Sequence, residues 1–260
     1  MPLAKLLDGI GALAKGKPDD RQIHALMTDS RRVVPGTVFV ARRGLQTDGN
    51  YFIEEAINRG AEAIVSEEAP GRAIQLPWVR VTDARRAVAL LARRFAGSPD
   101  EAMEVIGVTG TNGKTTVTML VQAMLASGGS GCGLIGTVRY DVGPRSLPAF
   151  RTTPEAVDTF DLLAQMRAAG LGYAAMEVSS HALDQDRLHG LRVGVAAFLN
   201  LTQDHLDYHG DMDRYFAAKA RLFDGSLGEP PRVAVFPADT PWGERLRALL
   251  PAGCTGLSFG

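Results

Sequence analysis

The chain has 260 residues, of which 45% are hydrophobic and 22% charged, and its formal net charge is −1. This length accommodates one large domain or two ordinary domains, each with its own core. The near-neutral charge gives no argument for nucleic acid or an anionic membrane as a partner, so we expect neither, and no run approaches the roughly 18 apolar residues of a membrane span.

Cysteine usage and the N-terminal residues indicate the compartment. Cys132 and Cys254 are far apart and lack metal-type spacing, which fits a reducing environment better than a disulfide framework. The first residues, MPLAKLLDGIGALAKGKPDD, acquire charge and proline too early for a signal peptide. We therefore expect a cytoplasmic α/β protein without membrane insertion.

The first part of the chain predicts a small α/β domain. In order, the pattern predicts a strand over 37–44 that ends in a loop, a helix over 51–60, a strand over 63–66, a strand over 78–83 and a helix over 83–97. Asp83 is placed to cap the last helix, which stops at Gly97-Ser98-Pro99. This break is the best domain boundary, at about residue 98.

The second part alternates strands and helices more regularly. The predicted strands cover 103–110, 173–180, 193–202 and 232–239, and the predicted helices cover 114–128, 156–170 and 211–223. Continuous apolar strands between helices are typical of a mostly parallel sheet with both faces covered. Polar clusters follow three of the strands, at Gly110–Thr115, Glu177–His181 and Asn200–His209. Since active sites in such sheets gather at the carboxyl ends of strands, these clusters are the candidate site.

The loop GVTGTNGKTTVTML (107–120) predicts a phosphate-binding site. Its order of strand, glycine turn, Lys-Thr and helix points backbone N–H groups at phosphates. Lys114 would neutralise the β- and γ-phosphates, and the Thr115 hydroxyl would bind Mg²⁺. The common consensus wants glycine where Val108 stands. A glycine turn that merely starts a helix is the alternative, but the context on both sides favours a nucleoside triphosphate.

Glu177 and the segments around it leave more than one interpretation. A carboxylate at the end of an apolar strand suits a Mg²⁺ ligand facing the phosphates, although a helix cap or an ion pair would also explain it. A Ser-His-Asp triad in MEVSSHALDQDRL is disfavoured because no G-x-S-x-G turn precedes it. The histidines and acids of 200–209 leave a zinc site conceivable, without a cysteine or a third spaced histidine to support it.

Lys219 is the unusual residue of the helix over 211–223, which Asp211 can cap. It lies on an apolar stripe, four residues after Tyr215 and three after Phe216, and the stripe continues to Leu222 and Phe223. A buried lysine is costly unless it is paired or chemically altered, and a side chain that snorkels to solvent is the alternative.

Four segments resemble a known family: TGTNGKTT, EVSSHALDQDR, NLTQDHLDYHG and YFAAKARLF. Together they resemble the Mur ligases of peptidoglycan synthesis, and more specifically the MurE type, the UDP-N-acetylmuramoyl-tripeptide synthetases. Upstream, TDSRRVVPGTVFVARRG and GLQTDGNYFIEEAINRGAEAIVSE resemble the N-terminal domain that holds the UDP end of the substrate. The family loop is written T-G-T-N-G-K-[ST]-[ST], so Val108 is ordinary there.

The resemblance implies an ADP-forming amide ligase of the cytoplasm. ATP would phosphorylate the free carboxylate of D-glutamate in UDP-MurNAc-L-Ala-D-Glu, and the amine of a diamino acid, meso-diaminopimelate or L-lysine, would attack the acyl-phosphate. The implied cofactors are ATP and Mg²⁺. The implied catalytic residues are Lys114, Glu177, His205 and Lys219, the last carbamylated by CO₂, and Thr115, Glu177, His205 and the carbamate would hold Mg²⁺.

The resemblance also implies three sets of binding positions. The ATP-binding positions are Gly110, Thr111, Asn112, Gly113, Lys114, Thr115 and Thr116. The UDP-contacting positions are Thr28, Ser30, Leu45, Gln46 and Thr47. The positions around the muramoyl-dipeptide are Arg151, Thr152, Thr153, Ser179, Gln185 and Arg187, where Arg151 departs from the asparagine of some members.

The resemblance covers the chain from about residue 26 and implies two of the three domains of such a ligase. Residues 1–98 would be the UDP-substrate-binding domain and 99–260 an incomplete central ATP-binding domain, without the C-terminal domain that selects the diamino acid. We therefore expect a monomeric fragment that does not complete the ligation alone.

Two alternatives stay open at this point. A ligase of the same superfamily, such as a folylpolyglutamate synthase, would lack the domain that DSRRVVPGTVFVA resembles. A non-catalytic nucleotide-binding module would have no reason to keep Glu177, His205 and Lys219 together.

Overall fold

The computed structural model describes residues 1–10, 12–15, 20–44, 47–71 and 73–260. The chain divides into two compact units, Met1–Phe95 and Ala96–Gly260, so the division falls just before the predicted Gly97-Ser98-Pro99 break. No described helix is long and apolar enough to cross a membrane.

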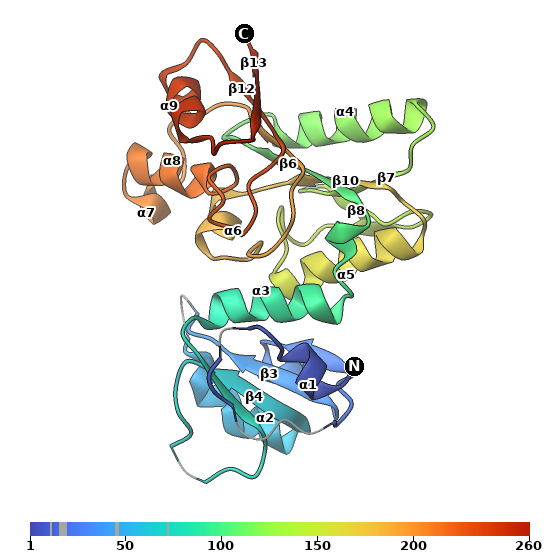
Figure 1. Cartoon of the computed structure of the whole chain (residues 1–260), viewed down its shortest axis with the longest axis vertical. Helices are drawn as coiled ribbons and strands as arrows, with labels where there is room; N and C mark the ends of the chain where they lie inside the picture. Colours follow the sequence, from blue (N-terminus) through green and yellow to red (C-terminus); the bar gives the residue numbers. More distant parts are fainter. Residues whose placement is uncertain (11, 16–19, 45–46, 72) are drawn as a thin grey trace. The chain divides into compact units, whose positions relative to one another are not determined.

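The first unit is a five-stranded sheet with helices on its faces (Figure 1). Its elements are α1 (Leu3–Leu6), β1 (Ala12–Lys15), β2 (Ala25–Met27), η1 (Ser30–Arg32), β3 (Thr37–Ala41), η2 (Gly49–Phe52), α2 (Ile53–Asn58), β4 (Ala61–Ser66), β5 (Trp78–Val81) and α3 (Ala84–Phe95). The strand order is β1-β5-β4-β3-β2, and only the β1–β5 pair is antiparallel.

The centre of this sheet is buried on both faces. The strand predicted over 37–44 is present as β3, which ends earlier, at Ala41. All five residues of β3 are buried. Phe39 packs with Ile53 and Ala56 of α2 and with Ile64 of β4 in one core cluster. The helix α3 contacts β2 and β3 and begins at Asp83, whose carboxylate accepts from the amides of Arg85 and Arg86, so the predicted cap is present.

The second unit is built on an eight-stranded sheet. Its elements are η3 (Pro99–Glu101), β6 (Glu104–Thr109), α4 (Lys114–Ser127), β7 (Cys132–Ile135), β8 (Arg139–Asp141), β9 (Ser146–Pro148), α5 (Ala156–Ala168), β10 (Tyr173–Glu177), α6 (Ser180–Asp184), β11 (Val195–Phe198), α7 (Leu206–His209), α8 (Met212–Ala220), β12 (Val233–Pro237), α9 (Pro241–Leu249) and β13 (Thr255–Phe259). The order is β13-β12-β11-β6-β10-β7-β8-β9, parallel from β13 to β7 and antiparallel beyond.

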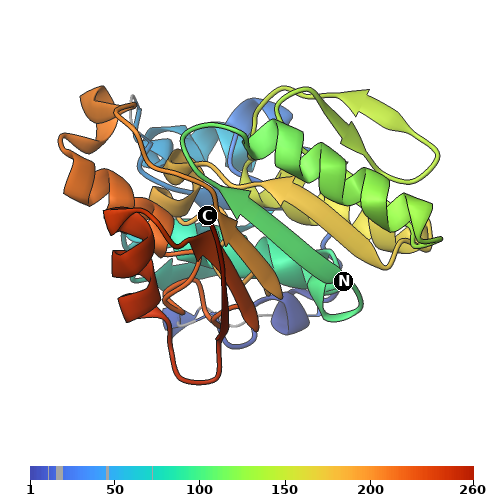
Figure 2. The ribbon, with the colours of Figure 1, turned by 90° about the horizontal axis from the view of Figure 1, so that it is seen from above.

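Helices cover both faces of this sheet, so the predicted fold class is confirmed. Figure 2 shows α4 lying along one face, where it contacts β10 and β7. On β7, a Cβ added to Gly133 would come within 2.3 Å of the Met166 sulfur of α5, so α5 packs closely against this strand. The short strands β7, β8, β9 and β13 and the helices α6, α7 and α9 were not predicted.

Candidate active site

The sheet order brings the three polar clusters together. β6 lies between β10 and β11, and all three strands are parallel. Glu177 at the end of β10 pairs in register with Val108, and Phe198 at the end of β11 pairs with Thr109. The loop after β6 is therefore flanked by Glu177–His181 on one side and by Asn200–His209 on the other, as the sequence predicts.

The loop after β6 leaves a helix N-terminus open. Gly113 precedes α4 with φ 86° and makes no side-chain cap, so the first amides of a 14-residue helix are offered to an anion. Gly110 has φ 152°, and a Cβ there would lie 3.1 Å from the Leu199 Cβ. Both conformations favour glycine. Lys114 Nζ donates to the carbonyls of Gly110 and Thr111 at 2.9 Å each, and burial lowers its pKa.

Asn200 clamps this loop from the end of β11. Its Oδ1 accepts from the Asn112 amide at 2.9 Å, and its Nδ2 donates to the Asn112 carbonyl at 3.1 Å. Its own carbonyl accepts from the Thr111 amide at 3.1 Å. Three hydrogen bonds from one residue thus fix the backbone that would face a phosphate. Sequence reasoning placed Asn200 in a polar cluster but assigned it no role.

Glu177 is a buried carboxylate held by neutral donors. The residue is 1% exposed. Its oxygens accept from the Thr115 hydroxyl at 2.9 and 3.0 Å, from the Thr137 amide at 2.8 Å and from the Thr137 hydroxyl at 3.1 Å. In the described part of the chain it makes no ion pair and caps no helix, so neither alternative interpretation holds. A buried carboxylate beside a hydroxyl provides oxygen ligands of the kind that Mg²⁺ binds.

Lys219 lies under the same loop. It is 1% exposed, so it does not snorkel, and Tyr215, Phe216, Leu222 and Phe223 are buried with it as predicted. Its Nζ donates to the Gly110 carbonyl at 2.9 Å and lies 4.5 Å from the centroid of the Tyr215 ring. Burial, helped by the positive charge of Lys114, lowers the pKa of Lys219 to about 7. A lysine in this state is partly neutral at physiological pH, which CO₂ capture requires.

His205 joins the site through an aromatic cluster. It follows Asp204 in a left-handed conformation, φ 51°, and remains half exposed. Its ring meets the His181 ring edge-on at 4.9 Å and lies 6.1 Å from the Tyr215 ring, which covers Lys219. His181 and His209 have pKa values lowered first by burial and also by neighbouring positive charges. The half-exposed His205 ring offers imidazole nitrogen atoms, which are common metal ligands.

No group of three or more His, Cys, Asp and Glu side chains in the described residues could hold a metal ion by itself. The residues that fit Mg²⁺ here differ from such a group, because they include a threonine hydroxyl and a lysine that becomes an oxygen ligand only as a carbamate. The conceivable zinc site at 200–209 gains no support.

A second network gathers the residues that resemble substrate contacts. The Thr153 hydroxyl accepts from the Ser179 amide at 3.0 Å, and the Thr153 carbonyl accepts from Arg187 at 2.9 Å. Arg187 also donates to Gln185 at 2.9 Å and lies 3.1 Å from Glu155. The other two residues of this set, Arg151 and Thr152, contact neighbours of the network. Arg151 pairs with Glu155 at 2.6 Å, and the Thr152 hydroxyl lies 3.0 Å from the Thr137 hydroxyl.

In the first unit, the described residues of the UDP-contacting set line one cavity of about 470 Å³. It is lined by Thr28, Asp29, Ser30, Arg31, Phe39, Thr47, Phe52 and Glu55. Ser30 lies at its wall and donates to Glu55 at 2.7 Å, and Asp29 caps η1 by accepting from the Arg31 amide. Thr28, Ser30 and Thr47 therefore lie together. Leu45 and Gln46 lie outside the described residues.

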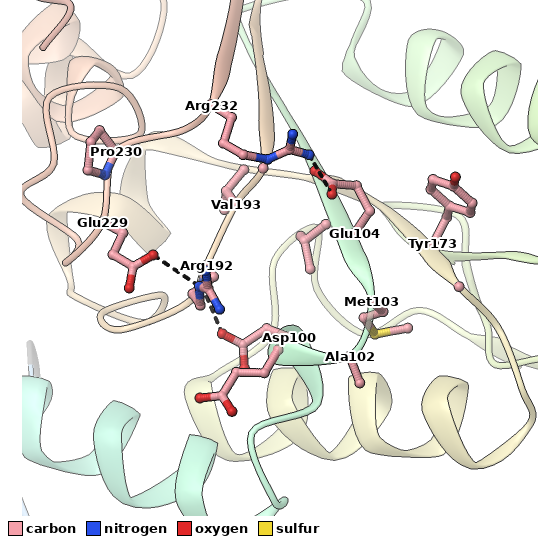
Figure 3. Close-up of a pocket in the computed structure, with 14 residues that line it drawn as sticks. Asp100, Ala102, Met103, Glu104, Tyr173, Arg192, Val193, Glu229, Pro230 and Arg232 are labelled. Atoms are coloured by element: carbon pink, nitrogen blue, oxygen red, sulfur yellow. Dashed lines mark hydrogen bonds and ion pairs between the residues drawn. The ribbon is translucent and has the colours of Figure 1, made fainter. Parts of the chain in front are cut away.

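A different cavity, of about 450 Å³, lies at the amino ends of β6 and β10, opposite the strand ends that carry the candidate site (Figure 3). Several of its charged groups pair with one another: Arg232 donates to Glu104 Oε2 at 2.8 Å, and Arg192 donates to Glu229 at 3.0 Å and, through its amide, to Asp100 at 2.9 Å. The other oxygen of Glu104, Oε1, is buried and has no hydrogen-bond partner among the described residues. The amino ends of parallel strands are not where ligands bind in such sheets, so this cavity is not the candidate site.

Comparisons with known proteins place both units of the chain in one family. A model of the Mur ligase middle domain matches residues 108–260, and a model described as the Mur ligase family catalytic domain matches residues 22–96. The UDP-N-acetylmuramoyl-L-alanyl-D-glutamate--2,6-diaminopimelate ligase of Solibacter usitatus is 46% identical over 226 residues, which are 87% of this chain and 46% of that relative.

Solved structures match over the whole fold. A structure of a UDP-N-acetylmuramoyl-L-alanyl-D-glutamate--2,6-diaminopimelate ligase aligns with a TM-score of 0.84 and 31% identity, over 99% of this chain and 52% of that one. A MurF ligase from Thermotoga maritima in complex with ADP aligns with a TM-score of 0.60 and 27% identity, over 93% and 51%. The chain therefore spans about half the length of the relatives it matches.

Proposed function

The chain belongs to the Mur ligase family, and we propose that it is the N-terminal and central part of an ATP-dependent ligase that adds a diamino acid to UDP-MurNAc-L-Ala-D-Glu. The observation that carries the proposal is the convergence of Thr115, Glu177 and Lys219 around one loop with an open helix N-terminus. The relatives named above join 2,6-diaminopimelate, which favours this diamino acid over L-lysine.

The proposed reaction has two steps. The D-glutamate carboxylate takes the γ-phosphoryl group of ATP, which breaks the bond to ADP and forms an acyl-phosphate. The neutral amine of the diamino acid then attacks the acyl carbon, a C–N bond forms, and inorganic phosphate leaves. The resemblance implies that the diamino-acid pocket lies in a third, C-terminal domain of such a ligase.

Within the chain, each residue has a role that its surroundings support. The ATP phosphates bind the amides of Gly110–Thr116 and the Lys114 ammonium, whose contacts to the loop carbonyls are exchanged for phosphate oxygens. Thr115, Glu177, His205 and a Lys219 carbamate hold Mg²⁺. When bound, the ion offsets the negative charge that builds up on the phosphoryl group.

In this proposal each unit binds a different part of the substrate. The uridine end binds in the cavity of Thr28, Ser30 and Thr47. Leu45 and Gln46, which the resemblance adds to the uridine contacts, lie outside the described residues. The muramoyl-dipeptide binds over Arg151, Thr152, Thr153, Ser179, Gln185 and Arg187. Arg151 and Arg187 both pair with Glu155 there, and the N–H donors that these guanidinium groups have beyond those pairs would meet the anionic D-glutamate. The proposed assembly is a cytoplasmic monomer.

The test is a pair of amide chemical-shift titrations of this chain. Mg²⁺·ATP should perturb residues 110–116 and the end of β10, and UDP should perturb residues 28–30 and 47. A non-catalytic nucleotide module would respond to ATP alone. UDP shifts confined to residues 110–116 would overturn the assignment of the first unit.

A further inference from the structure

Gly136 and Thr137, which follow β7, lie directly against the Glu177 carboxylate. A Cβ added to Gly136 would lie 2.6 Å from the Glu177 Oε1, closer than real Cβ atoms come to anything. The absence of a side chain at 136 is what admits the carboxylate. The next residue, Thr137, then meets Glu177 with two donors, its amide on Oε1 at 2.8 Å and its hydroxyl on Oε2 at 3.1 Å.

The number of hydroxyl protons determines which group donates in the contacts of Thr137. The Thr137 hydroxyl lies within hydrogen-bond distance of both the Glu177 Oε2 and the Thr152 hydroxyl, at 3.1 and 3.0 Å. It carries one proton, and an ionised carboxylate can only accept. When Thr137 donates to Glu177, Thr152 must donate to Thr137. From the other side, Thr115 also donates to Glu177.

These bonds form one chain, Thr152 to Thr137 to Glu177 from one side and Thr115 to Glu177 from the other. Thr152 belongs to the proposed substrate segment and Thr115 to the nucleotide loop. Donors on both carboxylate oxygens leave Glu177 little freedom to rotate, and fixed orientation is what a hard cation needs from a carboxylate ligand.

We propose that Thr137 is a positioning residue that fixes the Glu177 carboxylate for the metal ion and ties it to the substrate segment through Thr152. This inference rests on the proposed function, because it takes Glu177 as a metal ligand. Thr137 itself needs no contact with nucleotide or substrate, and neither composition nor local spacing singles it out, since it lies 40 residues from Glu177 in the chain.

The experiment measures the affinity of Mn²⁺ for the ADP complex of this 260-residue chain by electron paramagnetic resonance. Mn²⁺ serves as the probe for the Mg²⁺ position. Thr137→Val keeps the shape and the amide bond and removes the hydroxyl. It should weaken Mn²⁺ binding about tenfold, as expected for one hydrogen bond to a charged group. ADP affinity without metal should change less than about twofold. Thr137→Ser, which restores the hydroxyl, should bind Mn²⁺ like the wild type.

A double-mutant cycle tests the link to Thr152. Thr152→Val should weaken Mn²⁺ binding measurably in the wild type and add nothing in the Thr137→Val background, because the chain is already broken there. Wild-type Mn²⁺ affinity in Thr137→Val, an equal loss of metal-free ADP binding, or additive effects would each overturn the inference while leaving the proposed function intact. A wild-type chain that binds no Mn²⁺·ADP would overturn both.

Discussion

Replacing Lys219 by methionine should change how the stability of the second unit depends on pH. Lys219 is 1% exposed, and burial with the nearby Lys114 charge lowers its pKa from the ordinary 10.5 to about 7. The unfolded chain therefore binds more protons than the folded chain between pH 7 and 10.5. By linkage, the free energy of unfolding rises with pH across this window. Burial of the charged Lys219 ammonium destabilises the folded chain, and this destabilisation is fully present below pH 7.

The size of this effect follows from the same values. Each unit of pKa corresponds to about 1.4 kcal/mol, so the limiting slope is about 1.4 kcal/mol per pH unit. From pH 7.5 to 9.5 the wild type should gain about 2 kcal/mol relative to Lys219→Met, which has nothing to titrate there. At pH 7 the variant should be the more stable protein by about 1–3 kcal/mol, because methionine loses the bond to Gly110 but leaves no buried charge.

The assay is urea unfolding followed by Trp242, which stacks on Phe216 of α8. The chain has two tryptophans, so a Trp78→Phe background makes Trp242 the sole reporter. Solutions are kept free of CO₂, since carbamate formation would add its own pH dependence. Arg145→Met, which removes an exposed positive charge from the same unit, is the control and should parallel the wild type. Parallel curves for wild type and Lys219→Met would refute the reasoning.

Three further predictions concern the loop, the ligation and the uridine cavity. Asn200→Ala removes two hydrogen bonds to Asn112 and should weaken Mg²⁺·ATP binding about tenfold in calorimetry. Asn200→Asp should lose at least as much, because a carboxylate oxygen replaces the group that donates to the Asn112 carbonyl and repels the phosphates; unchanged affinity in both variants would contradict the clamp. In a protein that also carries the amino-acid-binding domain, Lys219→Ala should abolish turnover, keep ATP binding and regain part of the turnover with added short carboxylates; near-normal turnover without them would rule out the carbamate. Ser30→Ala should weaken UDP binding several-fold without moving the melting temperature by more than a few degrees, and a loss of stability equal to the loss of binding would point to a structural role instead.

Much of this site is readable from local sequence because its groups follow strand ends. The Gly-Lys-Thr-Thr turn, Glu177 after an apolar strand and Lys219 on an apolar stripe each break a local pattern, and the parallel order of β10, β6 and β11 then brings them together. The predicted strands and helices are present, the short ones included.

Other features depend on tertiary contacts that no local pattern encodes. Thr137 meets Glu177 across 40 residues, and Asn200 clamps Asn112 across 88. The strands β7, β8, β9 and β13 were not predicted, although β10 and β11, which were, also have five residues or fewer; length alone therefore does not separate them. The link between Arg151 and Arg187 passes through Glu155, a residue that sequence reasoning did not single out.

The measurement that tests the central claim most directly is calorimetric titration of this chain with Mg²⁺·ATP, comparing the wild type with Lys114→Ala. Lys114 is half-buried in the loop and donates only to the Gly110 and Thr111 carbonyls among the hydrogen bonds that the described residues make. The variant should keep its melting temperature and lose at least about tenfold in affinity, because the phosphates lose a charged partner. Equal affinity in the two proteins would contradict a phosphate site at this loop.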